Sequence, residues 1–330
     1  MTAPTPHILS FGEAMALFVA DAPGPLAEVA EYHRRLAGAD NNVAIGLARL
    51  GFTVRWLSRV GTDSLGRYVR QTLEAEQVDC RHLIDDPTHS TGLMFKARAL
   101  EGADPVVEYY RRASAASHMS RDDAGEAVFQ GIRHLHATGI TPALSAGCRE
   151  LAVHLMNEAR QRGASISFDP NLRPSLWRSE DEMREALNAL AFKADWVMPG
   201  LAEGRLLTGR ESPADIAAFY LDHGVRAVII KLGPEGSYYR GTQDGRDEQF
   251  TVPGFKVENV IDTVGAGDAF AVGVISGLLE GLTARAAVRR GNLLGAQAVQ
   301  VLGDMEGLPD LATLNALDAV HGPIDEVTGG

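Results

Sequence analysis

The run Asp262-Thr263-Val264-Gly265-Ala266-Gly267-Asp268-Ala269-Phe270 places two glycines directly before an apolar segment. The apolar residues of that segment recur at helical spacing: Phe270, Val274, Ile275, Leu278, Leu279 and Leu282. Glycines can adopt backbone angles closed to other residues, so consecutive N–H groups can turn toward one point. The start of the helix adds free N–H groups and the positive end of its dipole. The run therefore predicts an anion site, with the carboxylate of Asp268 beside it.

A glycine turn of this kind also has plainer interpretations. It can simply start a buried helix that Asp268 caps, because aspartate is favoured at that position. A dinucleotide-binding fingerprint is less favoured, since it needs a third glycine where Phe270 stands and belongs near a first strand. A Walker A loop needs Gly-Lys-Ser/Thr, which this sequence lacks. The turn by itself leaves the anion site and the simple helix start open.

With its signature Asp-Thr-x-Gly-Ala-Gly-Asp near the C-terminus, the chain resembles the ribokinase-like, or phosphofructokinase B type, family of carbohydrate kinases. The resemblance extends from Gly12 to about Gly307 and includes residues 38–51 and 60–66. It implies an α/β fold of three αβα layers, with a mostly parallel central sheet and a small β lid over the sugar. Residues 1–330 are then one kinase domain, with lid segments inserted at about 14–36 and 91–112.

Within this family, residues 109–116, 136–144 and 169–173 are most similar to the 2-keto-3-deoxygluconate kinases. The resemblance implies that ATP phosphorylates a small sugar acid. Asp268 is then the general base, and the amides of Gly265, Ala266 and Gly267 stabilise the transferred group. Met94 stands where close relatives carry a tyrosine. A fructokinase, a ribokinase or a 5-keto-2-deoxygluconate kinase remains an alternative, and so does a sugar sensor without catalysis; a dehydrogenase is least favoured.

Two arginines are candidates for binding the acid group of the sugar. Arg173 follows the predicted strand 165–169, and Arg111 ends the strand 106–110; ligands of open α/β sheets bind where strands end. The arginine fork pairs with a carboxylate through two hydrogen bonds. For each arginine, a solvated surface charge is the alternative interpretation.

Three further residues are candidate sugar contacts. By the resemblance, Gly38 lets the ligand approach the backbone, and the amide of Asn42 binds hydroxyl groups. Tyr109 offers a phenolic hydroxyl from the lid. The alternatives are a helix cap for Asn42 and simple packing for Tyr109.

The resemblance also supplies candidates for contact with ATP: Asn171, Lys231, Gly233, Gly236 and Asn292. Residues 230–236 resemble the family's crossing from a strand to a loop against the nucleotide, and a plain turn is the alternative. Asn292 falls where relatives line the adenine pocket. Because asparagine is unfavourable inside a helix, we expect it to have a polar partner.

Two carboxylates are candidates for cation binding. The family's Asn-x-x-Glu element, linked to Mg²⁺, falls at residues 200–203, where Gly200 replaces the asparagine. Mg²⁺ usually keeps several waters, so Glu203 can act through one; an ordinary acid in the first turn of a helix is the alternative. Asp262 either helps to hold a monovalent cation such as K⁺ beside the glycine turn or caps that turn.

Composition limits the partners of the chain. The net charge of −12 argues against nucleic acid. No run reaches the ~18 apolar residues of a membrane span, and residues 1–6 lack the basic start of a signal peptide. With Cys80 and Cys148 alone, a disulfide framework is not expected. These features predict a cytoplasmic enzyme that does not bind a membrane, and we expect it to form a homo-oligomer.

Apolar strands alternate with amphipathic helices along the chain, which predicts a sheet covered on both faces. The predicted strands are 7–11, 134–137, 165–169, 196–198 and 227–232, and the extended lid segments are 93–98 and 106–110. The predicted helices are 42–50, 64–77, 144–162, 180–193 and 214–223. The glycine-rich tail after His321 is expected to be disordered.

Overall fold

The computed structural model describes residues 7–98, 105–243 and 245–321, so the tail prediction lies outside the described residues. Their largest feature is a nine-stranded sheet. In spatial order its strands are β13 (Arg246–Pro253), β12 (Gly236–Gln243), β11 (Ala227–Lys231), β10 (Trp196–Val197), β9 (Ser165–Asp169), β8 (Ile132–Thr138), β1 (His7–Phe11), β4 (Thr53–Gly61) and β5 (Asp79–Asp86). Neighbours from β11 to β5 run parallel, and β12 and β13 add an antiparallel edge. The predicted, mostly parallel sheet is confirmed.

Helices connect most of these strands. The described α-helices are α1 (Ala39–Arg49), α2 (Ser64–Ala75), α3 (Thr141–Leu144), α4 (Ala146–Gln161), α5 (Glu180–Ala191), α6 (Leu201–Thr208), α7 (Pro213–Asp222), α8 (Ala266–Leu279), α9 (Ala284–Ala298) and α10 (Leu311–His321). Short 3-10 helices are η1 (Leu26–Glu28), η2 (Ala115–His118), η3 (Arg121–Asp123), η4 (Glu126–Phe129), η5 (Pro174–Leu176) and η6 (Gly233–Glu235). None of the helices in the described ranges is long and apolar enough to cross a membrane.

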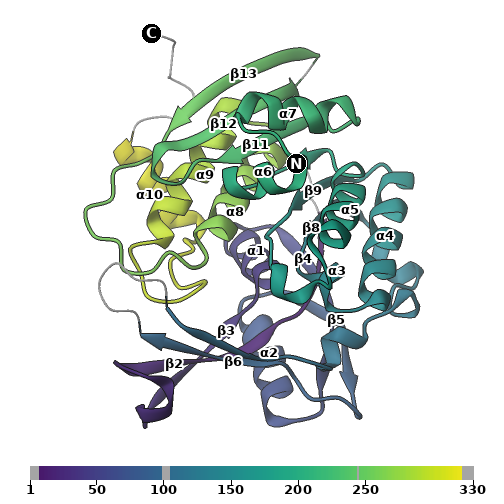
Figure 1. The fold of residues 1–330 in the computed structure, drawn as a ribbon, viewed down its shortest axis with the longest axis vertical. Helices are drawn as coiled ribbons and strands as arrows, with labels where there is room; N and C mark the ends of the chain where they lie inside the picture. Colours follow the sequence, from purple (N-terminus) through teal and green to yellow (C-terminus); the bar gives the residue numbers. More distant parts are fainter. Residues whose placement is uncertain (1–6, 99–104, 244, 322–330) are drawn as a thin grey trace.

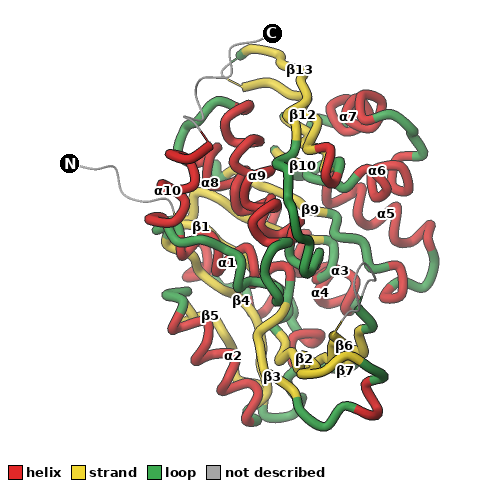
Figure 2. The backbone as a smooth tube through the Cα atoms, turned by 90° about the vertical axis from the view of Figure 1, so that its left-hand side faces the viewer, coloured by secondary structure: helices red, strands yellow, loops and turns green. Residues whose placement is uncertain are grey.

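The sheet is buried on both faces. In β11, Val228 and Ile230 point into one apolar core and Ile229 into the other, because side chains alternate along a strand. Figure 2 shows α8, α9 and α10 on one side of the strands and α5, α6 and α7 on the other. The predicted three-layer architecture is therefore confirmed, and it explains why β11 is an almost continuous apolar run.

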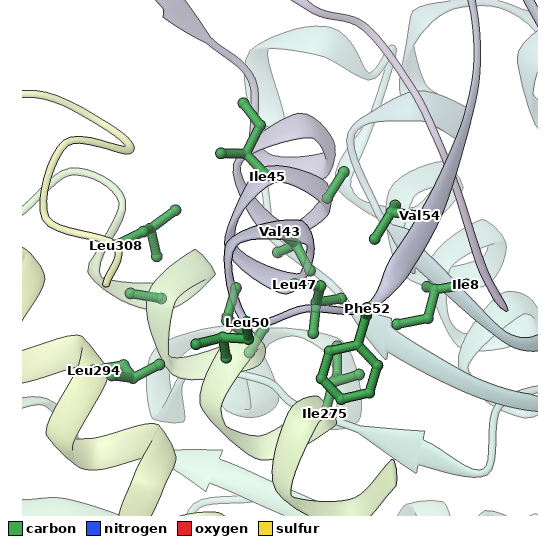
Figure 3. Packing of buried hydrophobic residues seen from close by; sticks show 14 of the residues in the cluster. Ile8, Val43, Ile45, Leu47, Leu50, Phe52, Val54, Ile275, Leu294 and Leu308 are labelled. Atoms are coloured by element: carbon green, nitrogen blue, oxygen red, sulfur yellow. The ribbon is translucent and has the colours of Figure 1, made fainter. Parts of the chain in front are cut away.

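Packing of α1 against α8 brings the starts of these two helices together. Figure 3 shows Val43 and Leu47 of α1 in the same buried cluster as Ile275 of α8. Gly46 permits the close approach, since a Cβ there would lie 2.5 Å from Cγ2 of Val272. Residues near the N-termini of the two helices are therefore neighbours, and Nδ2 of Asn42 lies 2.8 Å from Oδ2 of Asp268.

A second, four-stranded sheet lies below the large one in Figure 1. Its strands are, in order, β3 (Tyr32–Ala37), β2 (Met15–Pro23), β6 (Leu93–Arg98) and β7 (Val107–Tyr110). Strands β2 and β6 are parallel, and the outer pairs are antiparallel. These strands come from the two segments expected to form a lid. Their action as a lid, and the organisation as a single domain, stay predictions.

Several elements differ from the sequence-based prediction. Strands β4, β5, β12 and β13 were not predicted; β13 is largely exposed and carries polar residues, so it lacks the apolar signal of a central strand. The predicted helix 144–162 corresponds to α4, which begins at Ala146, and Leu144 instead ends the separate helix α3. Ser145 separates them because it is extended, with φ −164°, and its hydroxyl accepts a hydrogen bond from the N–H of Cys148.

Candidate active site

The glycine turn forms the N-terminal cap of α8. Gly265 has φ +80°, and a Cβ there would lie 2.3 Å from the carbonyl oxygen of Asp304, so no other residue fits. A Cβ at Gly267 would instead lie 3.5 Å from Nζ of Lys231, with no closer atom. The first amides of a helix have no partner within the helix. The turn therefore presents N–H groups, beside an ammonium, to the space in front of Gly267.

Asp268 lies in the first turn of α8 and is buried, with 8% of its surface exposed. Nδ2 of Asn42 donates to its Oδ2 at 2.8 Å, and Nδ2 of Asn171 lies 3.4 Å from its Oδ1. Burial raises the pKa of Asp268 from its ordinary 3.8 to about 7. A carboxylate with a pKa near neutrality takes up and releases protons readily, which suits a general base.

One cavity, of about 580 Å³, lies between the small sheet and the start of α8. Asp268, Gly265, Gly267 and all five residues predicted to contact the sugar line it: Gly38, Asn42, Tyr109, Arg111 and Arg173. Asn171 and Glu203 line the same cavity. We call it the sugar-side cavity. Asn171, predicted to contact ATP, thus lies on this side, where its amide approaches Asp268.

The two arginines of this cavity differ in their surroundings. Arg111 is buried, and its Nη2 lies 2.5 Å from Oε2 of Glu13, whose other oxygen accepts the hydroxyl of Ser114. Among the described residues, Nε of Arg111 has no hydrogen-bond partner. Arg173 is exposed and donates from Nη1 to the carbonyl of Leu172 at 2.8 Å. Glu13 thus fixes one guanidinium, while the other is held only by a local backbone contact.

A second cavity, of about 680 Å³, lies on the other side of the glycine turn and is lined by Gly233, Gly236, Asn292 and Ala266. We call it the nucleotide-side cavity. The two cavities share Lys231, Thr263 and Gly267. A ligand in each cavity would therefore meet at the turn.

Lys231 ends β11 and carries a charge at this meeting point. Its Nζ donates to Oδ2 of Asp169 at 2.6 Å. Burial lowers the pKa of Lys231, but the nearby Asp169 and Glu203 outweigh it and raise the pKa above its usual value. The ammonium is therefore charged at any physiological pH.

The side chain of Asn292 has the polar partners expected from its position inside a helix. Oδ1 accepts the hydroxyl of Ser237 at 2.9 Å, and Nδ2 lies 3.1 Å and 3.2 Å from the carbonyls of Val252 and Pro253. These bonds tie α9 to β12 and β13. Asn292 is thus a fixed part of the cavity wall, and its amide is already satisfied by the protein.

Both carboxylates predicted to bind cations have partners within the chain. Oε1 of Glu203 accepts the N–H of Leu172 at 2.8 Å, and Oε2 accepts that of Gly200 at 2.6 Å, which caps α6. Oδ1 of Asp262 accepts the N–H of Val264 at 3.1 Å, as expected of a cap, and Oδ2 is 2.6 Å from Nζ of Lys96. In the described part of the chain, no group of three or more His, Cys, Asp and Glu side chains is arranged to hold a metal ion.

Sequence reasoning did not single out four charged residues of this region: Glu13, Lys96, Asp169 and Asp304. The available signal was strongest for Lys96, which interrupts a buried apolar strand. A buried charge needs a partner. The sequence does not indicate which of the acids, more than a hundred residues away, supplies it.

The family model described as pfkB family carbohydrate kinase matches residues 5–311. The chain therefore belongs to the pfkB family of carbohydrate kinases, which confirms the family predicted from the sequence. A relative from Bacillus subtilis (strain 168), 2-dehydro-3-deoxygluconokinase, is 50% identical over 303 residues, which cover 91% of this chain and 92% of the relative.

Solved structures agree with this assignment. The PfkB protein from Polaromonas sp. JS666 is 51% identical, with a TM-score of 0.86, and the match covers 94% of this chain and 99% of that one. A putative ribokinase II from E. coli, in complex with ATP and Mg²⁺, is 28% identical, with a TM-score of 0.87 and coverage of 96% and 100%.

Proposed function

We propose that this kinase transfers the γ-phosphoryl group of ATP to the primary hydroxyl of 2-keto-3-deoxygluconate, also named 2-dehydro-3-deoxygluconate, to give 2-keto-3-deoxy-6-phosphogluconate. The observation that carries the proposal is the position of Asp268, a buried carboxyl with a pKa of about 7, in the sugar-side cavity beside the glycine turn. The choice of sugar is supported by the name of the Bacillus subtilis relative at 50% identity.

In the proposed reaction, the sugar hydroxyl lies against Asp268 and attacks the γ-phosphorus from the sugar-side cavity. A new O–P bond forms, the bond between the γ-phosphorus and the β–γ bridging oxygen breaks, and the hydroxyl proton moves to Asp268. ADP leaves through the nucleotide-side cavity. Asn42 orients the carboxylate by its 2.8 Å hydrogen bond to Oδ2.

The amides of Gly265, Ala266 and Gly267 are proposed to stabilise the charge on the transferred group, and Lys231 adds a positive charge beside them. ATP would bring Mg²⁺, which neutralises phosphate charge. Glu203 fits a contact through water, because each of its oxygens has one backbone partner and keeps a second lone pair. The small sheet would close over the sugar and exclude water, which otherwise competes as the acceptor.

The acid group of the sugar is assigned to the two arginines. Arg111 lines the cavity from the small sheet and retains an unpaired Nε, and Arg173 lines it from the loop after β9. A neutral sugar would leave Nε of Arg111 without a partner. Loss of one charge-assisted hydrogen bond costs about 1.5 to 3 kcal/mol, so an acid sugar should be preferred at least about tenfold in kcat/KM.

A coupled ADP-release assay with a panel of sugars tests the proposal. The panel contains 2-keto-3-deoxygluconate, 5-keto-2-deoxygluconate, fructose and ribose. Arg173→Ala should reduce activity on the acid much more than residual activity on neutral sugars, because Arg173 is exposed and its loss should not harm the fold. Arg178→Ala, which removes another exposed arginine just beyond the cavity, is the matched control.

A clear preference of the unmodified protein for fructose or ribose would refute the acid sugar while leaving the role of Asp268 standing. No ADP release with any sugar would favour the sugar sensor. The cytoplasmic location and the homo-oligomer stay predictions; light scattering of the purified protein tests the latter.

A further inference from the structure

Lys96 is a buried ammonium in the middle of β6. Its side chain is only 2% exposed, although lysine is almost never fully buried without a partner. Nζ donates to Oδ2 of Asp262 at 2.6 Å and lies 3.3 Å from Oδ1 of Asp304. The side chains of the two acids are 3% and 6% exposed. Lys96, Asp262 and Asp304 therefore form a buried charge cluster, which we call the Lys96 triad.

The Lys96 triad holds the turn that precedes α8. Oδ1 of Asp262 accepts the N–H of Val264, and the backbone carbonyl of Asp304 packs where a Cβ of Gly265 would stand, 2.3 Å away. The N–H of Gly303 also lies 3.4 Å from Oδ2 of Asp262. Both acids thus touch the phosphate-binding turn or its neighbours, while the cation comes from the small sheet. The triad joins the small sheet to the turn, and Lys96 and Asp304 line the sugar-side cavity together with Gly265.

Without Lys96, two buried carboxylates would lie close together beside a turn that has to receive phosphate. Burial raises the pKa of Asp304, and the charge of Lys96 opposes that rise. The negative charges of Asp262 and Glu306 raise the pKa of Asp304 further. A positive charge at this place is therefore needed both to keep Asp304 ionised and to limit repulsion of the incoming phosphates.

A monovalent cation bound by Asp262 was one of the two interpretations of this residue. It does not fit the structure, because an ammonium already lies 2.6 Å from the carboxylate oxygen that would coordinate it. The triad contains the charge that such an ion would bring.

We propose that Lys96 is a positioning residue that supplies, from within the chain, the positive charge beside the phosphate-binding turn, so that phosphoryl transfer needs no added monovalent cation. The proposal rests on the kinase function of the family but not on which sugar is phosphorylated.

The test compares the full-length wild type with Lys96→Ala in potassium chloride and in tetramethylammonium chloride at equal ionic strength. Tetramethylammonium is too large to enter between the two carboxylates. The wild type should have the same kcat in both salts. Lys96→Ala should lose at least about tenfold in kcat in tetramethylammonium, and ammonium, potassium or propylammonium should restore part of it, as expected when a transition-state interaction is removed and replaced. Lys193→Ala is the control, since it removes an ammonium that donates to Asn157 of α4. Its kcat should be the same in both salts.

A second pair of measurements does not depend on the sugar. Potassium should raise the Tm of Lys96→Ala but not that of the wild type. It should also restore the affinity for ATP that Lys96→Ala loses, as measured by calorimetry. If the single variant fails to fold, Lys96→Ala combined with Asp304→Asn keeps the net charge of the triad and should again be slow and activated by potassium.

A wild type that loses most of its kcat in tetramethylammonium would refute the proposal. So would a Lys96→Ala variant with normal kcat, or one whose losses in kcat and Tm no cation restores. If no sugar in the panel is phosphorylated, the proposed function fails, whereas the Tm and ATP-binding measurements still decide the role of Lys96.

Discussion

Replacement of Asp268 by asparagine should slow the enzyme and stabilise its fold at the same time. Asparagine keeps the shape of the side chain but cannot accept the hydroxyl proton. Turnover should therefore fall by roughly 10² to 10⁴, the usual contribution of a general base, while the affinity for ATP changes little.

The gain in stability follows from the pKa of Asp268, which burial raises from 3.8 to about 7. Below about pH 4 the carboxyl is protonated in both folded and unfolded chains. As the pH rises from there to about 7, the unfolded chain ionises first, so the wild type loses stability. Above pH 7 both states are ionised, and the loss stays constant at about 4 kcal/mol. The asparagine variant has no such loss.

Thermal unfolding of wild type and variant between pH 4 and pH 8 measures this difference. The Tm of Asp268→Asn relative to wild type should increase over the range by about 6 °C, given the unfolding entropy of a chain of this length. Asp222→Asn, which changes an exposed carboxylate at the end of α7, should show no such trend. A difference that does not vary with pH would show that the carboxyl is not destabilised by burial, and near-normal turnover would rule out its role as the base.

Three further predictions concern neighbouring residues. Asn42→Ala should move the acid limb of the kcat/KM profile to higher pH, because the Asn42 bond lowers the pKa of Asp268; an unmoved limb contradicts this. Gly265→Ala should lower the Tm, whereas Gly267→Val should fold normally by circular dichroism yet lose about 3 kcal/mol of transition-state stabilisation; full activity of the valine variant would refute the anion site. Asn292→Ala should raise the KM for ATP several times more than that for the sugar, since it loosens only the nucleotide-side wall; equal changes would argue against that position.

Much of the fold was predictable because it depends on local signals. Strands 7–11 and 165–169 were predicted with the bounds that the structure has, since each is a short segment with apolar residues that is followed by turn residues. The start of α8 was predictable because only glycine tolerates the positive φ of residue 265. Strand β13 was not predictable, because it forms an exposed edge of the sheet and has no apolar pattern. Its backbone pairing with β12 holds it in place.

Individual residues of the candidate site were predictable from the sequence, but the contacts between their side chains were not. The predicted sugar contacts lie in one cavity with Asp268, yet Glu13 as the partner of Arg111 and Lys96 as the partner of Asp262 were not foreseen. The last pair is separated by 166 residues, and a periodic pattern in the sequence carries no information on contacts at that distance. For Asp262, the sequence analysis had left open a monovalent cation and a cap of the turn.

Unusual backbone angles and buried ionisable groups are concentrated in this site. Gly265 and Asn171 both have positive φ, Asp268 is a buried carboxyl with a raised pKa, and Lys96 is a buried ammonium. The positive φ of Asn171 and the burial of the two ionisable groups lower the stability of the fold unless a partner offsets them. Asparagine at position 268 would be more stable at neutral pH, so stability does not explain the aspartate there. The requirement that explains it is a group able to take a proton from an alcohol at the point where the two cavities meet, and this requirement is the physical argument for catalysis over simple sugar binding.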